Sequence, residues 1–478
     1  MKLIKNYLYN VGNQILLLLV PLITVPYISR VLGPHNSGIN AYTNSWVTFF
    51  YLIGQMGVMM YGNREIAYTR DDLGTRSKTF WEIAFLQIIM SSLSLLAYII
   101  MVMITSSPFK LYFLYQSLWI MAYGLDISWY FMGIEDFKKT VVRNSIVKLV
   151  SVGLIFIVVR GKDDLSKYIL LLGFAQLAGS LTLWPYIKES ISWVKLNKLK
   201  PFSHFKGSLL LFVPTITTQI YMVINRIMLG QMSTQSLLGQ FDYSDKIVKL
   251  VLAIVTAAST VMLPHMANKF ASGDIKGIKK SLYNSFDFVT ALSIPLVFGI
   301  MAIAETFAPW FLGKHYVNTG HLMLFEAPMI LFIAWSSVTG NQYLMPVKRA
   351  HEYTLSVTIG AVINIIANYI LIKLLNVNGA AIASVISELA IAAIQLWMIR
   401  KSINIGRLLN NCWKYILSGL VMFEAVFYLN QHMLMNIFAL LIQMLAGVII
   451  YGMLLFILRA PIIKQASLIL KGKNKLVE

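Results

Sequence analysis

Residues 16–24, LLLLVPLIT, recur as LLLFVPTIT at residues 209–217, with seven of the nine positions identical. A second match follows each copy. Arg30-Val-Leu-Gly33 corresponds to Arg226-Ile-Met-Leu-Gly230, with one residue inserted. Both copies lie in apolar stretches of about 20 residues, the length that a helix needs to cross a bilayer. The sequence therefore predicts an internal repeat of membrane-spanning helices.

The composition of the whole chain supports a membrane protein. Of 478 residues, 58% are hydrophobic and 13% are charged, whereas soluble domains have roughly 45–50% apolar and about 25% charged residues. This excludes a soluble enzyme, a disulfide-rich secreted scaffold and a disordered chain. The net charge of +20 is explained by basic loops on one membrane face, so nucleic acid is not expected as a partner. Cys412 is the only cysteine, which excludes a disulfide framework.

The predicted fold class is an all-α polytopic membrane protein, because only helices and closed barrels satisfy their backbone in lipid and these runs are too long for barrel strands. The first apolar run continues through Pro21 and Pro26 without a small-residue cleavage site, so we expect a retained span. The predicted spans are about 7–29, 39–60, 80–104, 111–133, 142–159, 167–187, 208–230, 245–266, 282–305, 321–345, 352–374, 379–399, 412–430 and 434–458.

The basic residues orient these fourteen helices. With the N-terminus placed inside, the inner loops and tails carry 29 Lys and Arg residues and the outer loops carry seven. This bias follows the positive-inside rule, so we expect both termini to be cytoplasmic, in the plasma membrane. The longest loop, about 188–207, is basic and amphipathic. It either lies on the anionic inner leaflet or forms a solvated linker.

The repeat divides the chain into parts. Its two copies are six helices apart, so both halves enter the membrane in the same direction. We predict two parallel six-helix lobes, residues 1–200 and 201–405, and two additional helices with a cytoplasmic tail in residues 406–478. Pro21 and Pro214 occupy the same place in the two halves. Each is a candidate hinge, because proline removes a helix hydrogen bond, although membrane helices also tolerate proline without such a role.

Six ordered segments from both halves resemble the polysaccharide-transporter (Wzx-type) flippases, which belong to one superfamily with the MATE exporters and the MurJ-type flippases. The resemblance covers nearly the whole chain. The segments are PLITVPYISRVLGPHNSGINAY (21–42), YGNREIAYTRDD (61–72), DISWYFMGIEDFKKTVVRN (126–144), VPTITTQIYMVINRIMLGQMST (213–234), NQYLMPVKRAHEYT (341–354) and NVNGAAIASVISE (376–388).

This resemblance implies a V-shaped transporter of fourteen helices. Its substrate would be an undecaprenyl-pyrophosphate-linked oligosaccharide, moved from the inner to the outer leaflet for capsule, exopolysaccharide or O-antigen synthesis. Membrane lipids, a polysaccharide polymerase and chain-length machinery are the further partners implied. Two alternatives of the same fold stay open: a flippase for lipid II, and an ion-coupled exporter of cationic drugs, for which an acidic cavity would be expected. A glycan polymerase is disfavoured, because no outer loop exceeds about 20 residues.

Four cations near the outer ends of helices are the candidate pyrophosphate-binding residues. Arg30 and Arg226 match across the repeat, and Lys246 and Lys249 begin the eighth span. Arg is suited to bidentate phosphate contacts. Alternatively, the arginines reach the outer headgroups, and the lysines form i,i+4 ion pairs with Asp242 and Asp245.

Two carboxylates are candidates for coupling to H⁺ or Na⁺. Glu388 lies near the middle of the twelfth span, where an isolated carboxylate is costly. A hydrogen-bonded structural acid is the alternative. Asp126 in the fourth span is expected to pair with Lys148 of the fifth. Glu326 and Glu424 are expected to be wetted at helix ends. The sequence contains no nucleotide-binding loop, metal cluster or catalytic triad, so we predict a transporter without a cofactor and not an enzyme.

Overall fold

The computed structural model describes residues 2–464, and it describes their side chains except at 2–18, 213–215, 217–218 and 257–265. Every regular element within residues 2–464 is a helix, so the predicted all-helical class is confirmed. The chain forms two compact units, Met1–Gly239 and Gln240–Glu478. The boundaries that we predict for the transport lobes, after residues 200 and 405, remain predictions.

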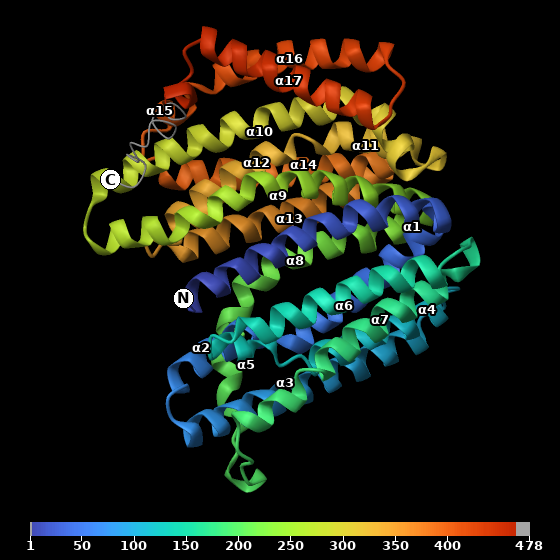
Figure 1. Ribbon diagram of the computed structural model, residues 1–478, viewed down its shortest axis with the longest axis vertical. Coiled ribbons are helices and arrows are strands. Elements are labelled where there is room, and N and C mark those ends of the chain that lie inside the picture. The colour runs from blue at the N-terminus through green and yellow to red at the C-terminus, as the bar shows by residue number, and fades with distance from the viewer. Residues whose placement is uncertain (1, 465–478) are drawn as a thin grey trace. The chain divides into compact units, whose positions relative to one another are not determined.

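The first unit contains eight α-helices and the start of a ninth (Figure 1). They are α1 (Lys2–Gln55), α2 (Val58–Thr69), α3 (Leu73–Ile104), α4 (Lys110–Gly124), α5 (Ser128–Gly133), α6 (Phe137–Val158), α7 (Leu165–Leu181), α8 (Phe205–Met232) and the first residues of α9 (Gln235–Ala271). Short 3₁₀ turns lie between α6 and α7 and along the connection between α7 and α8. Within this unit α1 packs against α3, α4, α6 and α8.

Up to residue 464, the second unit contains the rest of α9 and eight further α-helices. They are α10 (Ile275–Leu312), α11 (Val317–Glu326), α12 (Met329–Ser336), α13 (Ala350–Leu375), α14 (Val377–Ile399), α15 (Ile405–Leu409), α16 (Cys412–His432) and α17 (Ile437–Ile457). A π-helical segment, η6 (Ser337–Leu344), continues α12. Figure 1 shows α16 and α17 side by side, and both pack against α10. α10 also contacts α11 and α12, which makes it the central helix of this unit.

Each of the fourteen predicted spans overlaps helical residues, but some of them are interrupted or joined. The first two form one long α1 with non-helical torsions at Gly33 (φ 73°, ψ 173°), which glycine adopts because it has no Cβ. The fourth is broken between α4 and α5. In the tenth, α11 and the α12–η6 segment meet at a bend of 44°.

Among the described residues, eight helices are long and apolar enough to cross a membrane, and the bent pair adds a ninth. This confirms a multi-pass membrane protein. The count of fourteen, and the placement of both termini in the cytoplasm, remain predictions.

Polar residues fix the ends of several of these helices. Asp72 caps α3 by accepting a hydrogen bond from the Thr75 amide at 2.7 Å, and hydrogen bonds from Thr75 lower the pKa of this carboxyl. Asn436 caps α17 in the same way. The turn between α13 and α14 needs Gly379, because a Cβ there would lie 2.0 Å from the Leu371 carbonyl oxygen. The helices therefore start and turn where the sequence supplies capping residues or glycine.

Candidate functional site

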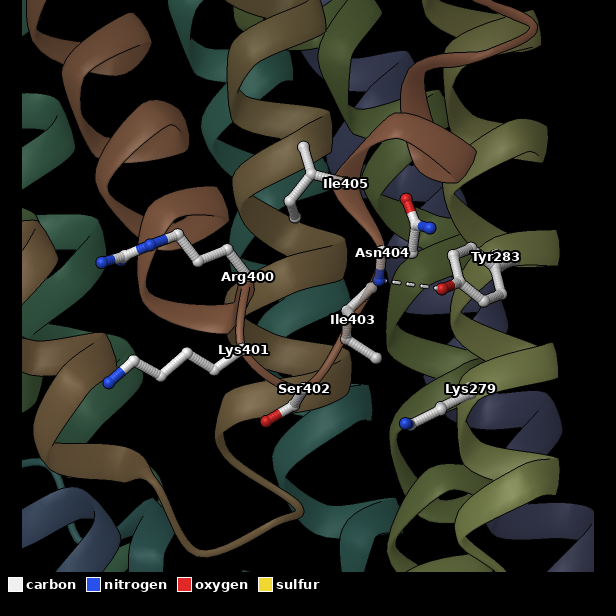
Figure 2. A pocket seen from close by; sticks show the side chains of 8 residues that line it. All are labelled: Lys279, Tyr283, Arg400, Lys401, Ser402, Ile403, Asn404 and Ile405. Atoms are coloured by element: carbon white, nitrogen blue, oxygen red, sulfur yellow. Dashed lines mark hydrogen bonds between the residues drawn. The ribbon is translucent and has the colours of Figure 1, made fainter.

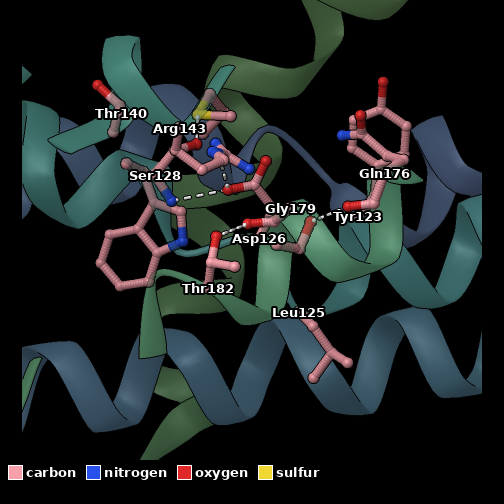
Figure 3. A network of polar contacts seen from close by, with 12 residues as sticks. Tyr123, Leu125, Asp126, Ser128, Thr140, Arg143, Gln176, Gly179 and Thr182 are labelled. Atoms are coloured by element: carbon pink, nitrogen blue, oxygen red, sulfur yellow. Dashed lines mark hydrogen bonds and ion pairs between the residues drawn. The ribbon is translucent and has the colours of Figure 1, made fainter. Parts of the chain in front are cut away.

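Asp126 lies in the break between α4 and α5, only 4% exposed, and is held by two partners (Figure 3). One carboxylate oxygen, Oδ1, accepts a hydrogen bond from the Ser128 amide at 2.9 Å. The same oxygen lies 3.7 Å from the Arg143 guanidinium of α6, which is itself nearly buried. The predicted partner of Asp126 was Lys148, and that pairing is wrong. Arg143 stands nearer the start of α6, level with the helix break, so it meets the carboxylate instead.

A buried glutamine forms hydrogen bonds with backbone carbonyl groups at this helix break. Gln87 of α3 donates from its amide nitrogen to the carbonyl oxygens of Tyr123 and Asp126, at 2.6 and 3.0 Å. Its amide oxygen accepts from the indole nitrogen of Trp129 at 2.8 Å. Unpaired carbonyl groups are costly in a membrane core. The hydrogen bonds therefore fix the α4–α5 break rigidly and hold Asp126 in place.

The helix α7 closes the other side of the same network. The Thr182 hydroxyl donates to the Gly179 carbonyl oxygen at 2.7 Å (Figure 3). A Cβ at Gly179 would lie 3.0 Å from Val147 and 3.6 Å from the Arg143 side chain. The absence of a side chain at Gly179 thus lets α6 approach closely and leaves room for the guanidinium.

The second unit has a buried polar layer in α13, α14 and η6. Glu388 of α14 is 6% exposed and lies close enough to Tyr353 to interact with it electrostatically. About two turns further along α14, Gln395 accepts from the Thr339 hydroxyl at 2.7 Å and donates to Ser356 at 3.0 Å. Glu388 is therefore a buried acid on a helix that also carries a hydrogen-bonded polar side chain.

Two amides in this layer have unused hydrogen-bonding atoms. The Gln342 side-chain oxygen in η6 and the Asn364 side-chain nitrogen in α13 are buried and find no hydrogen-bond partner among the described residues. Asn364 uses its oxygen to accept from Asn368 at 2.9 Å. Buried polar groups without a hydrogen-bond partner are uncommon in native structures, so each one calls for a specific explanation. π-Helical segments are often found at functional sites.

The four predicted pyrophosphate-binding residues fall into two pairs. Arg30 of α1 is exposed and Arg226 of α8 is half-buried, both in the first unit. Lys246 and Lys249 belong to α9 in the second unit, where Lys246 pairs with Asp242 and Lys249 pairs with Asp245 at 2.6 Å. The i,i+4 ion pairs that were the alternative for the lysines are thus present. The Lys246 side chain is still 48% exposed, whereas its aspartate is almost buried.

The two predicted hinges lie in the matched helices α1 and α8. Pro21 is inside α1, twelve residues before the non-helical torsions at Gly33. Pro214 lies in α8 but outside the residues whose side chains are described. The hinge role of both prolines remains a prediction.

Glu326 is buried, so the expectation that it is wetted at a helix end is wrong. Its side chain is at 0% exposure and accepts a hydrogen bond from the Ser244 hydroxyl of α9. α11 does end at Glu326, but the chain bends there and continues into α12, so this helix end lies within the unit. Glu424, by contrast, is exposed.

Sequence reasoning missed two further buried carboxylates. Asp287 of α10 is 9% exposed and accepts from the Tyr415 hydroxyl of α16 at 2.7 Å. Glu82 of α3 lies 3.0 Å from the His204 Nε2 atom and accepts from the Lys200 amide at 2.8 Å. A signal was present for both, since each is an acidic residue within a predicted span.

The His204 ring extends this contact to a third segment. Its Nδ1 atom lies 2.8 Å from the Tyr61 hydroxyl oxygen of α2. The connection between α7 and α8 is therefore fastened to α2 and α3, and further hydrogen bonds from Arg76 and Trp81 to the carbonyls of residues 190 and 192 continue the attachment. This basic segment is thus not simply a solvated linker. Within residues 2–464, no cluster of three or more His, Cys, Asp or Glu side chains could hold a metal ion.

Comparison with known proteins decides the family. A family model described as "Polysaccharide biosynthesis protein" matches residues 3–270, more than half of the chain. The chain belongs to this family. A second model, described as "Lipid II flippase MurJ", matches residues 140–459. The resemblance drawn from the sequence motifs is therefore confirmed: the chain is a Wzx-type member of the polysaccharide biosynthesis family and matches the MurJ family model as well.

Relatives of this polysaccharide biosynthesis protein cover most of its length. A protein of Escherichia coli strain K12 named "Putative O-antigen transporter" is 23% identical over 409 residues, which are 83% of this chain and 97% of the relative. The solved structure of the lipid II flippase MurJ in an inward closed conformation has a TM-score of 0.73 at 17% identity, covering 96% of this chain and all of that one. An inward-facing multidrug resistance MATE transporter has a TM-score of 0.61 at 13% identity, covering 80% and 94%. These two structures establish the fold.

Proposed function

We propose that this protein is a flippase that moves an undecaprenyl-pyrophosphate-linked oligosaccharide from the inner to the outer leaflet of the plasma membrane. The oligosaccharide would be a repeat unit for capsule, exopolysaccharide or O-antigen synthesis, and the movement would follow alternating access between two lobes. The observation that carries this proposal is membership of the polysaccharide biosynthesis family, together with a relative named for O-antigen transport that matches over 83% of the chain.

The proposal assigns the pyrophosphate to cations and the sugars to polar side chains within the helices. Arg226 and Arg30 would grip the phosphates in a bidentate manner. Lys246 and Lys249 would contribute by exchanging their aspartate partners for the substrate, since an exposed lysine in an i,i+4 pair is only weakly held. No bond of the substrate is made or broken in this process, so the protein acts as a transporter.

Deletion of the gene tests the function directly. In a strain that lacks the protein, we expect complete repeat units linked to undecaprenyl pyrophosphate to accumulate on the inner leaflet, and the surface polysaccharide to be lost. Mass spectrometry of extracted lipids measures the intermediate and identifies its glycan. Normal surface polysaccharide without an accumulated intermediate would contradict the proposal.

Substitution of Arg226 tests the binding site. We expect the order Arg > Lys ≫ Gln for flipping activity at equal protein level, because Lys offers a point charge in place of a planar fork. The matched control is Arg160→Gln, in the loop between α6 and α7, which should retain activity. Combining Arg226→Gln with Arg30→Gln should be non-additive if both grip one phosphate group. Full activity of Arg226→Gln in complementation would remove Arg226 from the site.

Ion coupling is proposed for Glu388, with Asp126 as the second candidate. Glu388→Gln should abolish transport while the protein folds and inserts normally, because the amide cannot exchange a proton or bind Na⁺ as a carboxylate does. Glu424→Gln is the matched control, since Glu424 is an exposed carboxylate on α16. The contact of Asp126 with Arg143 favours a structural role for this second acid. Normal transport by Glu388→Gln would exclude the coupling role.

A lipid II flippase is the second candidate function, because the MurJ model matches residues 140–459. The test is complementation of a strain that depends on a lipid II flippase for growth. Rescue of growth by this chain, together with intact surface polysaccharide in its own deletion strain, would favour lipid II as the substrate.

A further inference from the structure

A basic pocket lies in the second unit, and none of the residues that line it is assigned to transport (Figure 2). It is formed where the turn after α14 meets the first part of α10, and its volume is about 610 Å³. Its lining is Lys279, Tyr283, Arg400, Lys401, Ser402, Ile403, Asn404 and Ile405. The volume is within the range of about 300–1,000 Å³ that is usual for small-ligand sites.

The turn that forms this pocket is held in a defined position. Ile403 and Leu408 are buried in the core of the unit, at 2% and 4% exposure. The Asn404 amide donates to the Tyr283 hydroxyl at 3.1 Å (Figure 2). The Arg407 guanidinium lies 4.6 Å from the centre of the Tyr283 ring. The polar groups of the turn are therefore presented by a fixed backbone.

The charged residues that line the pocket are all positive. Three of its eight lining residues, Lys279, Arg400 and Lys401, are cations, and no lining residue is acidic. Among the residues that the structure describes, these cations form no ion pair with a carboxylate. Figure 2 shows Arg400 and Lys401 extending in the same direction from the turn, while Lys279 reaches from α10 on the other side of residues 402–404. Such a surface selects an anion.

Aromatic side chains indicate the membrane level of this pocket. Trp397, at the end of α14, is 60% exposed, and Trp413, at the start of α16, is 55% exposed. The Arg400 guanidinium lies 3.9 Å from the centre of the Trp397 ring. Exposed tryptophans are enriched at the headgroup level of a bilayer. Loops 267–281 and 400–414, which bring the pocket's cations, are both basic and are both predicted to be cytoplasmic.

We propose that this pocket binds the phosphate of an anionic phospholipid headgroup from the inner leaflet, separately from the transported substrate. The cations supply the charge, the Ser402 hydroxyl and the side-chain nitrogen of Asn404 supply hydrogen bonds, and Trp397 anchors the site at the headgroup level. Basic pockets at the cytoplasmic ends of membrane helices are suited to such headgroups.

Lipid titration of the purified full-length protein tests this proposal. Native mass spectrometry counts bound phosphatidylglycerol, cardiolipin and phosphatidylcholine on the wild type and on the Lys279→Gln/Arg400→Gln/Lys401→Gln variant. We expect the wild type to prefer the anionic lipids, and the variant to bind them roughly 10- to 100-fold more weakly, because each basic residue near an anionic surface contributes to binding. Binding of phosphatidylcholine should be unchanged.

Two further variants separate the pocket from general charge and from misfolding. Lys138→Gln/Lys195→Gln/Lys198→Gln removes three exposed lysines from other loops predicted to be on the same face, and should retain anionic lipid binding. Lys279→Arg/Arg400→Lys/Lys401→Arg keeps the charges and should also retain it. Equal loss in the Lys138→Gln/Lys195→Gln/Lys198→Gln variant, or full binding by the Gln variant of the pocket, would overturn the proposal. The last measurement uses inorganic phosphate. If the pocket binds phosphate but shows no preference for anionic lipids, the ligand is free phosphate and the lipid headgroup is excluded.

Discussion

Asp126 in the first unit and Asp287 in the second are both almost buried aspartates on predicted spans, yet they are held by different chemistry. Asp126 lies beside the Arg143 guanidinium of α6, so a cation from within the same bundle balances it. Asp287 accepts a hydrogen bond from the Tyr415 hydroxyl, and Tyr415 belongs to α16, one of the two additional C-terminal helices.

The difference shows that a buried carboxylate in a predicted span can be held either by a cation or by a hydroxyl donor. An ion pair leaves an uncompensated charge when one partner is removed, which is costly in a buried site. Removal of a hydroxyl donor leaves an acceptor unsatisfied but strands no opposite charge, which costs less. The first unit therefore uses its aspartate to hold its own helices together. In the second unit, Asp287 attaches α16 to α10, and a separate hydrogen bond from the Tyr451 hydroxyl to the Ala291 carbonyl attaches α17.

The largest effect is expected from breaking the ion pair. Asp126→Ala should destabilise the protein by about 3–5 kcal/mol, because Arg143 is left buried without its counter-charge. Arg143→Ala should cost a similar amount. Thermal unfolding in detergent measures the change. The double variant Asp126→Asn/Arg143→Gln should be less damaging than the sum of its single variants, and strict additivity would show that the two side chains do not act as a pair.

A smaller effect is expected at the contact between Asp287 and the Tyr415 hydroxyl. Tyr415→Phe should cost about 1–3 kcal/mol, because the buried Asp287 carboxylate loses a hydrogen bond. The loss should be local: hydrogen exchange should accelerate in α16 and α17 while α3 to α7 remain protected. Asp287→Asn keeps an acceptor for the Tyr415 hydroxyl and serves as the milder control. Faster exchange throughout the first unit would contradict a local role.

The smallest effect is expected at Asp164, a partly buried aspartate in the turn between α6 and α7. Asp164 accepts from the amides of Arg160 and Gly161, at 2.8 and 2.9 Å, and pairs with Lys167 at 2.6 Å. These contacts, Lys167 first, lower the pKa of the Asp164 carboxyl to about 2. Asp164→Ala should accelerate amide exchange in residues 160–164 and leave global unfolding nearly unchanged.

The sign of the pH dependence follows from this lowered pKa. The interaction of Asp164 stabilises the turn fully above the ordinary carboxyl pKa of about 4, and is lost as the pH falls toward about 2. Protection of the Arg160 and Gly161 amides from hydrogen exchange should therefore not change between about pH 8 and about pH 5, because this whole interval lies above the ordinary carboxyl pKa. A loss of protection within that interval would show that another group controls the turn.

Pairing between helices was the least predictable feature. Lys148 was expected to meet Asp126, because sequence position alone does not show at which level the side chains of neighbouring helices meet. α6 starts at Phe137, so Arg143 lies on the helix and level with the break at Asp126. In contrast, the pairs Asp242–Lys246 and Asp245–Lys249 were anticipated as an alternative, because i,i+4 spacing fixes proximity on a helix.

The sequence by itself determined that this chain is an all-helical membrane protein, because apolar runs of about 20 residues must satisfy their backbone internally. It also showed that the first and seventh predicted spans share a repeated segment. Its ordered motifs also determined the family. Only the tertiary structure decided which polar side chains meet: Asp126 with Arg143, Asp287 with Tyr415, and Glu326 with Ser244. These contacts join different helices, and they depend on the rotation, level and bending of each helix, which the packing of side chains across the unit determines.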